Sequence, residues 1–575
     1  MNYRMPWGLV LATATLLSLT ACGGGSGATV ATPTTTTFSG VAATGAAMAN
    51  ATVTISCASG TGTTKTDANG SYTKDLAGIT LPCALKAASS DGTTVLYSVT
   101  TATATGSSTQ VANITPMTQL LVASLAGTDP ATFFTNFSAN ASTVTTSSVS
   151  AAQTAVLTTL SNAGLNVSSL TDLLTGTLVA ATSSTTGNAY DVALDALKAQ
   201  LTASGTTLDT LTTAVAAASP SASTTTATTN ANTPSLPATQ LLKTADTNCA
   251  ALRSGDYWAI TPTKGGNISN QFASGSYNAS TKTAANLAGE STVLSDNGAC
   301  QYLAADGLSN IVVSQAGIVV ARYLDGSSVS RLGLAIPKQA IAVSDLAGTW
   351  STLNFEMNIA GTGYVGASAT ATVSATGVLS SVTGCDGAVA ASACTAGTDA
   401  MNFQANSDGA LDLVDTTDHS TSRAFAYRTG SGRLMLVTVD GDGSLTFLTK
   451  QSTLDLPAVG TVAPKSWSVR ANNLLVAKTL IVSYTTTITG KDAAAGSYTR
   501  TQNSATGAAD YSDTILVNNP RNGYNFRAAA SGVASTVSGT VNLPERTSLG
   551  LPGTGLSVQS IPGLTALQVS IDQPL

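Results

Sequence analysis

The spacing of apolar residues divides the chain into β-rich and helical parts. Between residues 38 and 112 apolar and polar residues alternate, so that Val53, Ile55 and Cys57 fall on one side of a predicted strand. A cluster of Asp, Asn and Gly at 67–70 interrupts the alternation, as turns between strands do. We therefore predict a small all-β domain over residues 38–112.

The period lengthens to three and four residues after residue 113. Thr115 followed by Pro116 is typical of a helix N-terminus, and Gly127 is a suitable end for the same helix. We predict a small helical bundle over residues 113–218. Its clearest amphipathic stripe has helical spacing and consists of Tyr190, Leu194, Leu197 and Leu201.

Residues 219–243 are rich in Ser, Thr, Ala and Pro and contain few large apolar side chains. Such a composition buries too little surface to offset the entropy of ordering the chain, so we predict a linker. The β pattern returns after it, punctuated by the Asp-Gly and Asn-Gly dipeptides that are typical of hairpins. The clearest predicted hairpins cover residues 318–334 and 434–448.

These two hairpins indicate an internal repeat. Trp258 precedes the first hairpin and Trp350 the second, and each tryptophan is followed by a cysteine at a similar distance. A third tryptophan, Trp467, begins a stretch without cysteine. We predict two related antiparallel β modules and a diverged β segment, which are module 1 (244–345), module 2 (346–456) and the C-terminal segment (457–575). One larger barrel shared by all three is the alternative, and the sequence does not separate the two.

The fold class that follows is multidomain and mainly β. A β-sandwich comes first, then the helical bundle, and then antiparallel modules that are barrel-like or sandwich-like. Charge is sparse, since 9% of the 575 residues are charged, against roughly 25% in ordinary soluble proteins, and the net charge is −6. The sequence contains no run of basic residues that would neutralise phosphates, so we predict no nucleic-acid partner. We predict no metal and no cofactor, because the sequence has one histidine, His419, and no C-x-x-C pair.

Residues 1–21 have one positive charge, a short apolar run and small residues at the end, which is the layout of a secretory signal peptide. The segment Leu19-Thr20-Ala21-Cys22, at the end of this signal peptide, resembles the lipobox of bacterial lipoproteins. The resemblance implies cleavage before Cys22, acylation of that cysteine and a lipid anchor in the outer membrane, because Gly rather than Asp follows it. Residues 22–37 would form a flexible tether. Both the periplasmic and the cell-surface face stay open.

The six cysteines that follow Cys22 form an even set in an oxidising compartment. Proximity along the chain favours three pairs within separate domains. We predict structural disulfides for Cys57–Cys83, Cys249–Cys300 and Cys385–Cys394.

Two pieces of the first β domain resemble a known family. They are Ser39-Gly40-Val41 with the following Gly45 and Ala51-Thr52-Val53, and the more specific run Thr66-Asp67-Ala68-Asn69-Gly70-Ser71-Tyr72. Together they resemble a carboxypeptidase regulatory-like, or transthyretin-like, β-sandwich. The resemblance implies a fold that serves as a spacer or binding platform rather than a specific activity.

One short motif indicates a ligand site. Gly348-Thr349-Trp350 resembles the G-x-W that opens lipocalin-type barrels, in which the tryptophan closes one end of the barrel. The resemblance makes Trp350 a candidate ligand-site residue and the barrel interior a candidate site for a small apolar ligand. The acidic run 440–444 has a spacing similar to a calcium loop, but it lacks the glutamate of such a loop, so we predict a turn.

The sequence shows no catalytic constellation, and we predict no catalytic residue. No G-x-S-x-G motif is present, and His419 lies in a polar, turn-like stretch. The leading hypothesis is a non-enzymatic lipoprotein of the cell envelope that serves as a binding, adhesion or structural module for a protein or glycan. The alternative is a carrier of a small apolar ligand, and a hydrolase is third. A cavity of some hundreds of Å³ would favour the carrier, whereas a filled core with an exposed apolar patch would favour surface interaction.

Overall fold

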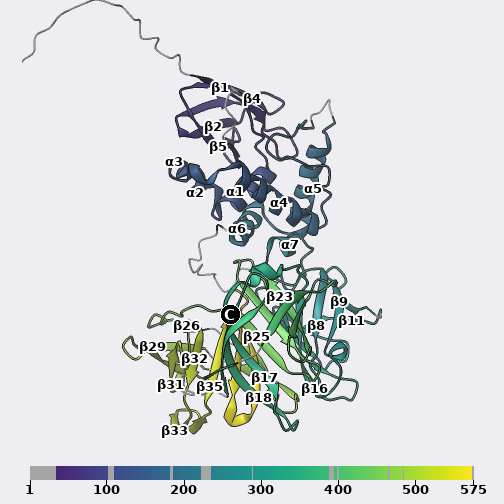
Figure 1. Cartoon of the computed structure of the whole chain (residues 1–575), viewed down its shortest axis with the longest axis vertical. Helices are drawn as coiled ribbons and strands as arrows, with labels where there is room; N and C mark the ends of the chain where they lie inside the picture. Colours follow the sequence, from purple (N-terminus) through teal and green to yellow (C-terminus); the bar gives the residue numbers. More distant parts are fainter. Residues whose placement is uncertain are drawn as a thin grey trace, which may run out of the picture.

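The computed structural model shows a multidomain, mainly β protein, as the sequence predicts (Figure 1). A β-sandwich and a group of helices lie at one end of the long axis, and three antiparallel sheets lie at the other. The predicted signal peptide and Cys22 lie outside the described residues. No helix in the described part of the chain is long and apolar enough to cross a membrane. The structure describes residues 34–101, 109–181, 186–219, 221, 235–287, 289–386, 394–397, 400–463, 466–482, 485–504 and 506–572.

Two sheets form the N-terminal sandwich, with strand orders β4-β1-β7 and β3-β2-β5-β6. Phe38, Val53 and Ile55 are fully buried between them. The Asp67 carboxylate accepts backbone N–H groups at 2.8 and 2.9 Å, which makes the predicted turn. The first strand begins at Thr35, inside the predicted tether. The strands are β1 (Thr35–Val41), β2 (Thr52–Ser59), β3 (Thr61–Lys65), β4 (Ser71–Ala77), β5 (Thr80–Ala88), β6 (Val95–Thr100) and β7 (Thr109–Val111).

The helical domain follows directly. Thr115 caps the first helix, because its side chain accepts the Thr118 N–H while the Thr118 hydroxyl accepts the Thr115 N–H. Gly127 ends that helix with φ = 62°, a conformation that favours glycine. The helices are α1 (Pro116–Ala126), α2 (Pro130–Thr135), α3 (Phe137–Asn140), α4 (Thr146–Asn162), α5 (Ala189–Ser204), α6 (Leu208–Ala218) and α7 (Ala238–Leu241).

Residues 235–243, which we assigned to the linker, belong to the helical domain instead. Leu236, Leu241 and Leu242 are buried in the same core as the bundle helices. These leucines supply the apolar surface that the Ser/Thr-rich stretch before them lacks, so this end of the segment packs. The same core includes Ala84 and Val99 of the sandwich.

Modules 1 and 2 each form a nine-stranded antiparallel sheet with the same order of strands. The orders are β11-β10-β9-β8-β16-β15-β14-β13-β12 and β20-β19-β18-β17-β25-β24-β23-β22-β21. In each sheet the first strand pairs with the last, β8 with β16 and β17 with β25, so the sheet curls back on itself. Only Leu294 separates β11 from β12, so a single chain segment carries both edges of the module 1 sheet.

The strand bounds of module 1 are β8 (Gly255–Ile260), β9 (Phe272–Asn278), β10 (Thr283–Asn286), β11 (Ser291–Val293), β12 (Ser295–Asp296), β13 (Gln301–Leu303), β14 (Asn310–Val313), β15 (Val319–Leu324) and β16 (Ser330–Pro337). Those of module 2 are β17 (Gly348–Met357), β18 (Tyr364–Val373), β19 (Leu379–Asp386), β20 (Thr395–Ala396), β21 (Met401–Ala405), β22 (Leu411–Asp415), β23 (Thr421–Arg428), β24 (Leu434–Val439) and β25 (Leu445–Lys450).

The C-terminal segment forms a third, ten-stranded sheet with the order β26-β29-β30-β31-β32-β35-β36-β37-β27-β28, and β33 pairs with β34 apart from it. Its first long strand again pairs with its last, β27 with β37. The strands are β26 (Val462–Ala463), β27 (Ser466–Asn472), β28 (Ala477–Val482), β29 (Thr486–Asp492), β30 (Ser497–Asn503), β31 (Ala509–Val517), β32 (Tyr524–Arg527), β33 (Ala530–Ser535), β34 (Gly539–Leu543), β35 (Arg546–Leu551), β36 (Leu556–Ile561) and β37 (Ala566–Asp572).

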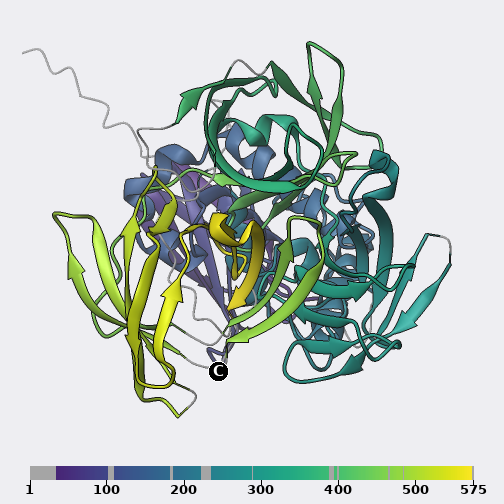
Figure 2. The ribbon, with the colours of Figure 1, turned by 90° about the horizontal axis from the view of Figure 1, so that it is seen from below.

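One hydrophobic core joins the three sheets. It includes Ile260 of module 1, Phe425 of module 2 and Val569 of the C-terminal segment, all fully buried. Figure 2 shows the three sheets side by side around this core. Strand pairing among the described residues stays within each sheet. The chain therefore forms three curled sheets with a common core, and the alternative of one shared barrel is wrong.

Candidate ligand cavity

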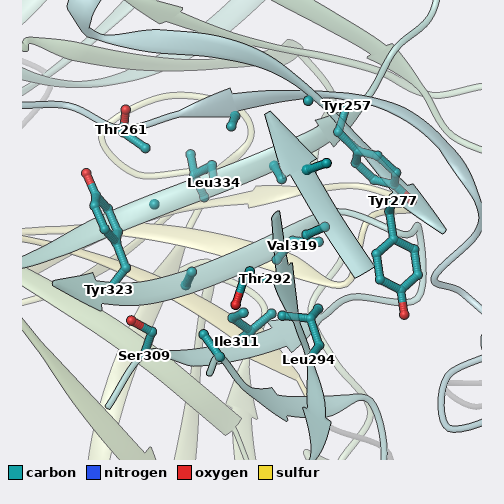
Figure 3. Close-up of a pocket in the computed structure, with 18 of the residues that line it drawn as sticks. Tyr257, Thr261, Tyr277, Thr292, Leu294, Ser309, Ile311, Val319, Tyr323 and Leu334 are labelled. Carbon is teal, nitrogen blue, oxygen red and sulfur yellow. The ribbon is translucent and has the colours of Figure 1, made fainter. Parts of the chain in front are cut away.

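The curled sheet of module 1 lines a partly open cavity of about 450 Å³ (Figure 3). Side chains alternate along β8, so Tyr257 and Thr261 line the cavity while Trp258 and Ile260 enter the shared core. A volume of this size is within the range of small-molecule sites. The lining is mostly apolar and includes Leu252, Ala259, Tyr277, Ala284, Ala285, Leu294, Ile311, Val319, Ala321, Gly333 and Ala335.

Small residues in module 1 explain the cavity, as a comparison with module 2 shows. Both modules begin with a glycine of positive φ, Gly255 at 143° and Gly348 at 129°, and their paired strands then correspond residue by residue. Ala335 lies opposite Ala259, and the equivalent pair in module 2 is Leu448 opposite Thr352.

The neighbouring strand shows the same difference. Val319 lies opposite Ala335 in module 1, whereas Leu436 lies opposite Leu448 in module 2. Leu436 and Leu448 are both buried in the interior of module 2. Alanine and valine leave unfilled the volume that two leucines occupy at the equivalent positions of module 2.

A buried polar network closes one end of the cavity. Asp246, which is 3% exposed, accepts the hydroxyls of Tyr277 at 2.5 Å and Tyr302 at 2.7 Å. Burial raises the pKa of both tyrosines, and the facing carboxylate raises it further, so both hydroxyls keep their protons and donate to Asp246. The Tyr257 hydroxyl donates to the Arg253 carbonyl at 2.8 Å beside this network.

The opposite end of the cavity carries hydroxyl groups. Tyr323, Thr261 and Ser309 lie together there (Figure 3). Burial raises the pKa of Tyr323 to about 12, although the Thr261 hydrogen bond opposes the shift, so Tyr323 is neutral at physiological pH. Gly333 makes room for the Tyr323 ring, because a Cβ at this glycine would lie 3.1 Å from Tyr323 Cδ1. The cavity is therefore mostly apolar along its walls, with a group of hydroxyls at this end.

Trp350, the residue that the sequence singled out, lines neither of the cavities described here. Its side chain is 1% exposed and packs inside module 2, where its Nε1 donates to the Leu346 carbonyl at 2.7 Å. The Lys450 ammonium lies 5.2 Å from the centre of its ring. The position equivalent to Trp350 in module 1 is Tyr257, not Trp258, which lies on the outer face. The tryptophans that indicated the repeat therefore point to opposite sides of their sheets.

The three disulfides join the pairs that proximity favours. They are Cys57–Cys83 between β2 and β5, Cys249–Cys300 in module 1 and Cys385–Cys394 in module 2. The second of them ties the segment that carries Asp246 to the chain just before β13. It therefore holds the closed end of the cavity in place.

A second, polar cleft of about 540 Å³ lies where the helical domain meets modules 1 and 2. Lys338 lies over the Trp258 ring at 3.8 Å from its centre. Asp256, Asp408 and Arg428 also line the cleft, so both signs of charge are present. This mixture indicates no particular ligand chemistry.

The remaining sequence candidates lie in turns. His419 is exposed at φ = 63°, and its backbone N–H donates to the Asp415 carbonyl at 3.1 Å. The acidic run is the predicted turn, because the Asp440 N–H donates to the Ser444 carbonyl at 3.0 Å and the Ser444 N–H to the Asp442 carboxylate at 2.8 Å. Across the described ranges, no group of three or more His, Cys, Asp or Glu side chains is placed to hold a metal ion.

Comparisons with known proteins give two findings. No family model matches the chain, and no curated protein does. Solved structures of transferrin-binding protein B are similar in part. That of serogroup B Neisseria meningitidis is 9% identical over 52% of this chain, with a TM-score of 0.17, and a mutant from Haemophilus parasuis is 8% identical over 56%, also with a TM-score of 0.17. The match spans 62% of the first structure and 77% of the second. At these TM-scores the two proteins give no information about the function of this chain.

Proposed function

We propose that this protein is a lipoprotein of the cell envelope that binds a small apolar ligand inside module 1. The observation that supports binding is the cavity of about 450 Å³, which is lined mainly by Ala, Val, Leu and Tyr side chains. The lipid anchor rests on the sequence Leu19-Thr20-Ala21-Cys22. An outer-membrane location follows from the same motif and its Gly23.

The distribution of polar groups indicates the kind of ligand. The walls offer mainly apolar contact, while Tyr323, Thr261 and Ser309 bring hydroxyls together at one end. Ser276, Thr292 and the Asp306 carboxylate add polar atoms to the lining. A neutral ligand with an apolar body and a single hydrogen-bonding end would satisfy both regions. An anionic head group would lose hydration without gaining an opposite charge, because the one charged residue in the lining, Asp306, is acidic.

The proposal favours the carrier over the broader hypothesis of an adhesion or structural module. The discriminating observation is the interior of the C-terminal β region, which is open in module 1 and filled in module 2 by Trp350, Leu436 and Leu448. A hydrolase would need a nucleophile and a base in reach of each other. The cavity wall offers hydroxyls without a histidine partner, so we propose no catalytic role.

Fluorescence titration of the purified full chain with N-phenyl-1-naphthylamine, an apolar dye, tests this proposal. We expect saturable binding of one dye per chain. The Ala335→Leu variant copies the side chain that fills module 2 and should weaken binding about tenfold or more, in line with the 1–3 kcal/mol that overpacking typically costs.

Ala530→Leu is the matched control, because Ala530 is exposed on β33 and far from the cavity lining. It should leave dye binding unchanged. Equal affinity of A335L and the unmodified protein, with both folded by circular dichroism, would show that the dye binds elsewhere and would overturn the proposal.

A further inference from the structure

The sheet of the C-terminal segment has one apolar and one charged face. Along β27, β35 and β37 the apolar side chains, such as Val469, Leu549 and Val569, enter the shared core. The opposite face carries arginines on neighbouring strands. Arg500 on β30 lies opposite Asp513 on β31, and Arg527 on β32 lies opposite Arg546 on β35.

Of three guanidinium groups on this face, two share one carboxylate. Asp513, with a side chain that is 2% exposed, accepts two hydrogen bonds from Arg500 at 2.7 and 3.0 Å and one from Arg527 at 3.1 Å. Arg546 has a weaker partner, since it donates to the neutral Gln559 side chain at 3.3 Å. Within the described residues, Asp513 is the only carboxylate that forms an ion pair with these arginines. The cluster therefore has two positive charges in excess.

Such an arrangement is costly without a further anion. Like charges directly opposite each other on antiparallel strands destabilise the pair, and a buried charge without a partner costs more than one in water. The Nε atoms of Arg527 and Arg546 are buried and have no hydrogen-bond partner in the protein. The pKa of Arg546 is lowered to about 9, mainly by burial and also by the charges of Arg500 and Arg527, while Asp513 opposes the shift.

A fourth arginine on the same face shows the contrast. Arg470 on β27 donates twice to the Gln568 side chain, at 3.0 and 2.7 Å. Two strands, β36 and β37, separate β27 from β35, so Arg470 stands apart from the cluster. Its side chain is half-buried like that of Arg546, which makes it a suitable control position.

We propose that Arg500, Arg527 and Arg546 form a binding site for a phosphate-type dianion, either free or as a monoester. Two excess positive charges match the charge of a phosphate dianion. Guanidinium groups donate pairs of parallel hydrogen bonds that fit phosphate oxygens, and buried Nε–H donors are the groups that such oxygens would satisfy. Arg500 and Arg546 are each partly exposed, which places the cluster at the surface of the sheet. The site is separate from the module 1 cavity and does not depend on the function proposed for it.

Isothermal titration of the full chain with inorganic phosphate at about pH 7.5 tests the site, with chloride as the background anion at matched ionic strength. We expect one phosphate per chain. The Arg546→Gln variant should bind about tenfold more weakly or worse, as the loss of a charge-assisted hydrogen bond predicts. Arg470→Gln should bind as the unmodified chain does. A second titration with glycerol phosphate distinguishes the source, because tighter binding of the monoester identifies a phosphorylated molecule and tighter binding of inorganic phosphate identifies the free ion.

Thermal unfolding of each variant in phosphate-free buffer shows whether a loss of phosphate binding comes from the binding site or from a failure to fold. R546Q removes a repelling charge and should be at least as stable as the unmodified chain. If R546Q does not fold, the Arg546→Lys variant serves instead. Lysine keeps the charge but lacks the planar pair of N–H donors of a guanidinium group, so this variant too should bind phosphate more weakly. Phosphate that binds no better than chloride, or an equal response of R546Q and R470Q, would show that the arginines have only a structural role.

Discussion

Modules 1 and 2 have the same order of strands and the same pairing of first and last strand, but their interiors differ. Module 1 is open at Ala335, and module 2 is filled by Leu448 at the equivalent position. The outward-facing positions of the same strands do not differ in this way. Ile260 and Leu353 are equivalent, and both are fully buried in the shared core.

The comparison shows which face of each sheet is free to change. The shared core requires large apolar side chains on the outer face of both modules, because three sheets pack there at once. The inner face of each module packs against its own strands and short neighbouring segments, such as Leu346 in module 2 and Leu252 in module 1. A change from Leu to Ala on that face opens a cavity without disturbing the packing between modules, so the fold can be kept while the interior acquires a ligand site.

The largest expected effect is the reverse change in module 2. Leu448→Ala should destabilise that module by about 2–5 kcal/mol, because it removes buried methyl groups and leaves a cavity. Hydrogen exchange of the β24 and β25 amides measures the local free energy of opening. Leu474→Ala is the control, since Leu474 is 45% exposed. A cost below about 1 kcal/mol for L448A would mean that the module 2 interior is loosely packed, and the contrast between the modules would fail.

The disulfides provide a second, smaller contrast. Cys249–Cys300 closes a loop with a sequence separation of 51, whereas Cys385–Cys394 closes one of 9. Removal of the first pair by substitution with Ala should therefore cost more stability, by about 1.5 kcal/mol in the chain-entropy relation. Module 1 should also bind the dye less well, since this disulfide holds the closed end of the cavity. Urea unfolding of the two Cys→Ala variants under oxidising conditions measures the difference. A larger loss from the module 2 variant would contradict the expectation.

Local chemistry made much of the fold predictable from the sequence. The Thr115 cap, the Gly127 end, the turn at Asp67 and the cysteine pairs all depend on residues that are close in the chain or within one domain. The end of the linker was misassigned because Leu241 and Leu242 pack onto helices that are distant in sequence. The shared core was not predictable for the same reason.

The site was harder to predict because strand faces change with a shift of one residue. Alignment of Trp258 with Trp350 places the repeat one position out of register, and every inward residue of module 1 is then read as outward. An alignment of Gly255 with Gly348 makes Ala259 equivalent to Thr352. Their pairing partners, Ala335 and Leu448, then both face the interior of their modules. The arginine cluster gave no local signal, since its members come from four strands.

The smallest effect concerns the polar ends of the two interiors, where Tyr323 in module 1 corresponds to Asp440 in module 2. Burial raises the pKa of Asp440 above its ordinary value of 3.8, and the charge of Asp442 adds to this, although a hydrogen bond from Ser422 opposes it. The folded state therefore binds the proton more tightly than the unfolded state does, and stability falls as the pH rises above about 4. Asp440→Asn should remove this loss, so the variant should gain stability at pH 7 and match the unmodified protein at pH 3. Hydrogen exchange in β24 at both pH values measures the difference. An equal gain in stability at pH 3 and pH 7 would show that the amide side chain, and not the loss of the charge, stabilises the variant. Module 2 would then tolerate a buried carboxylate at the position where module 1 has a tyrosine.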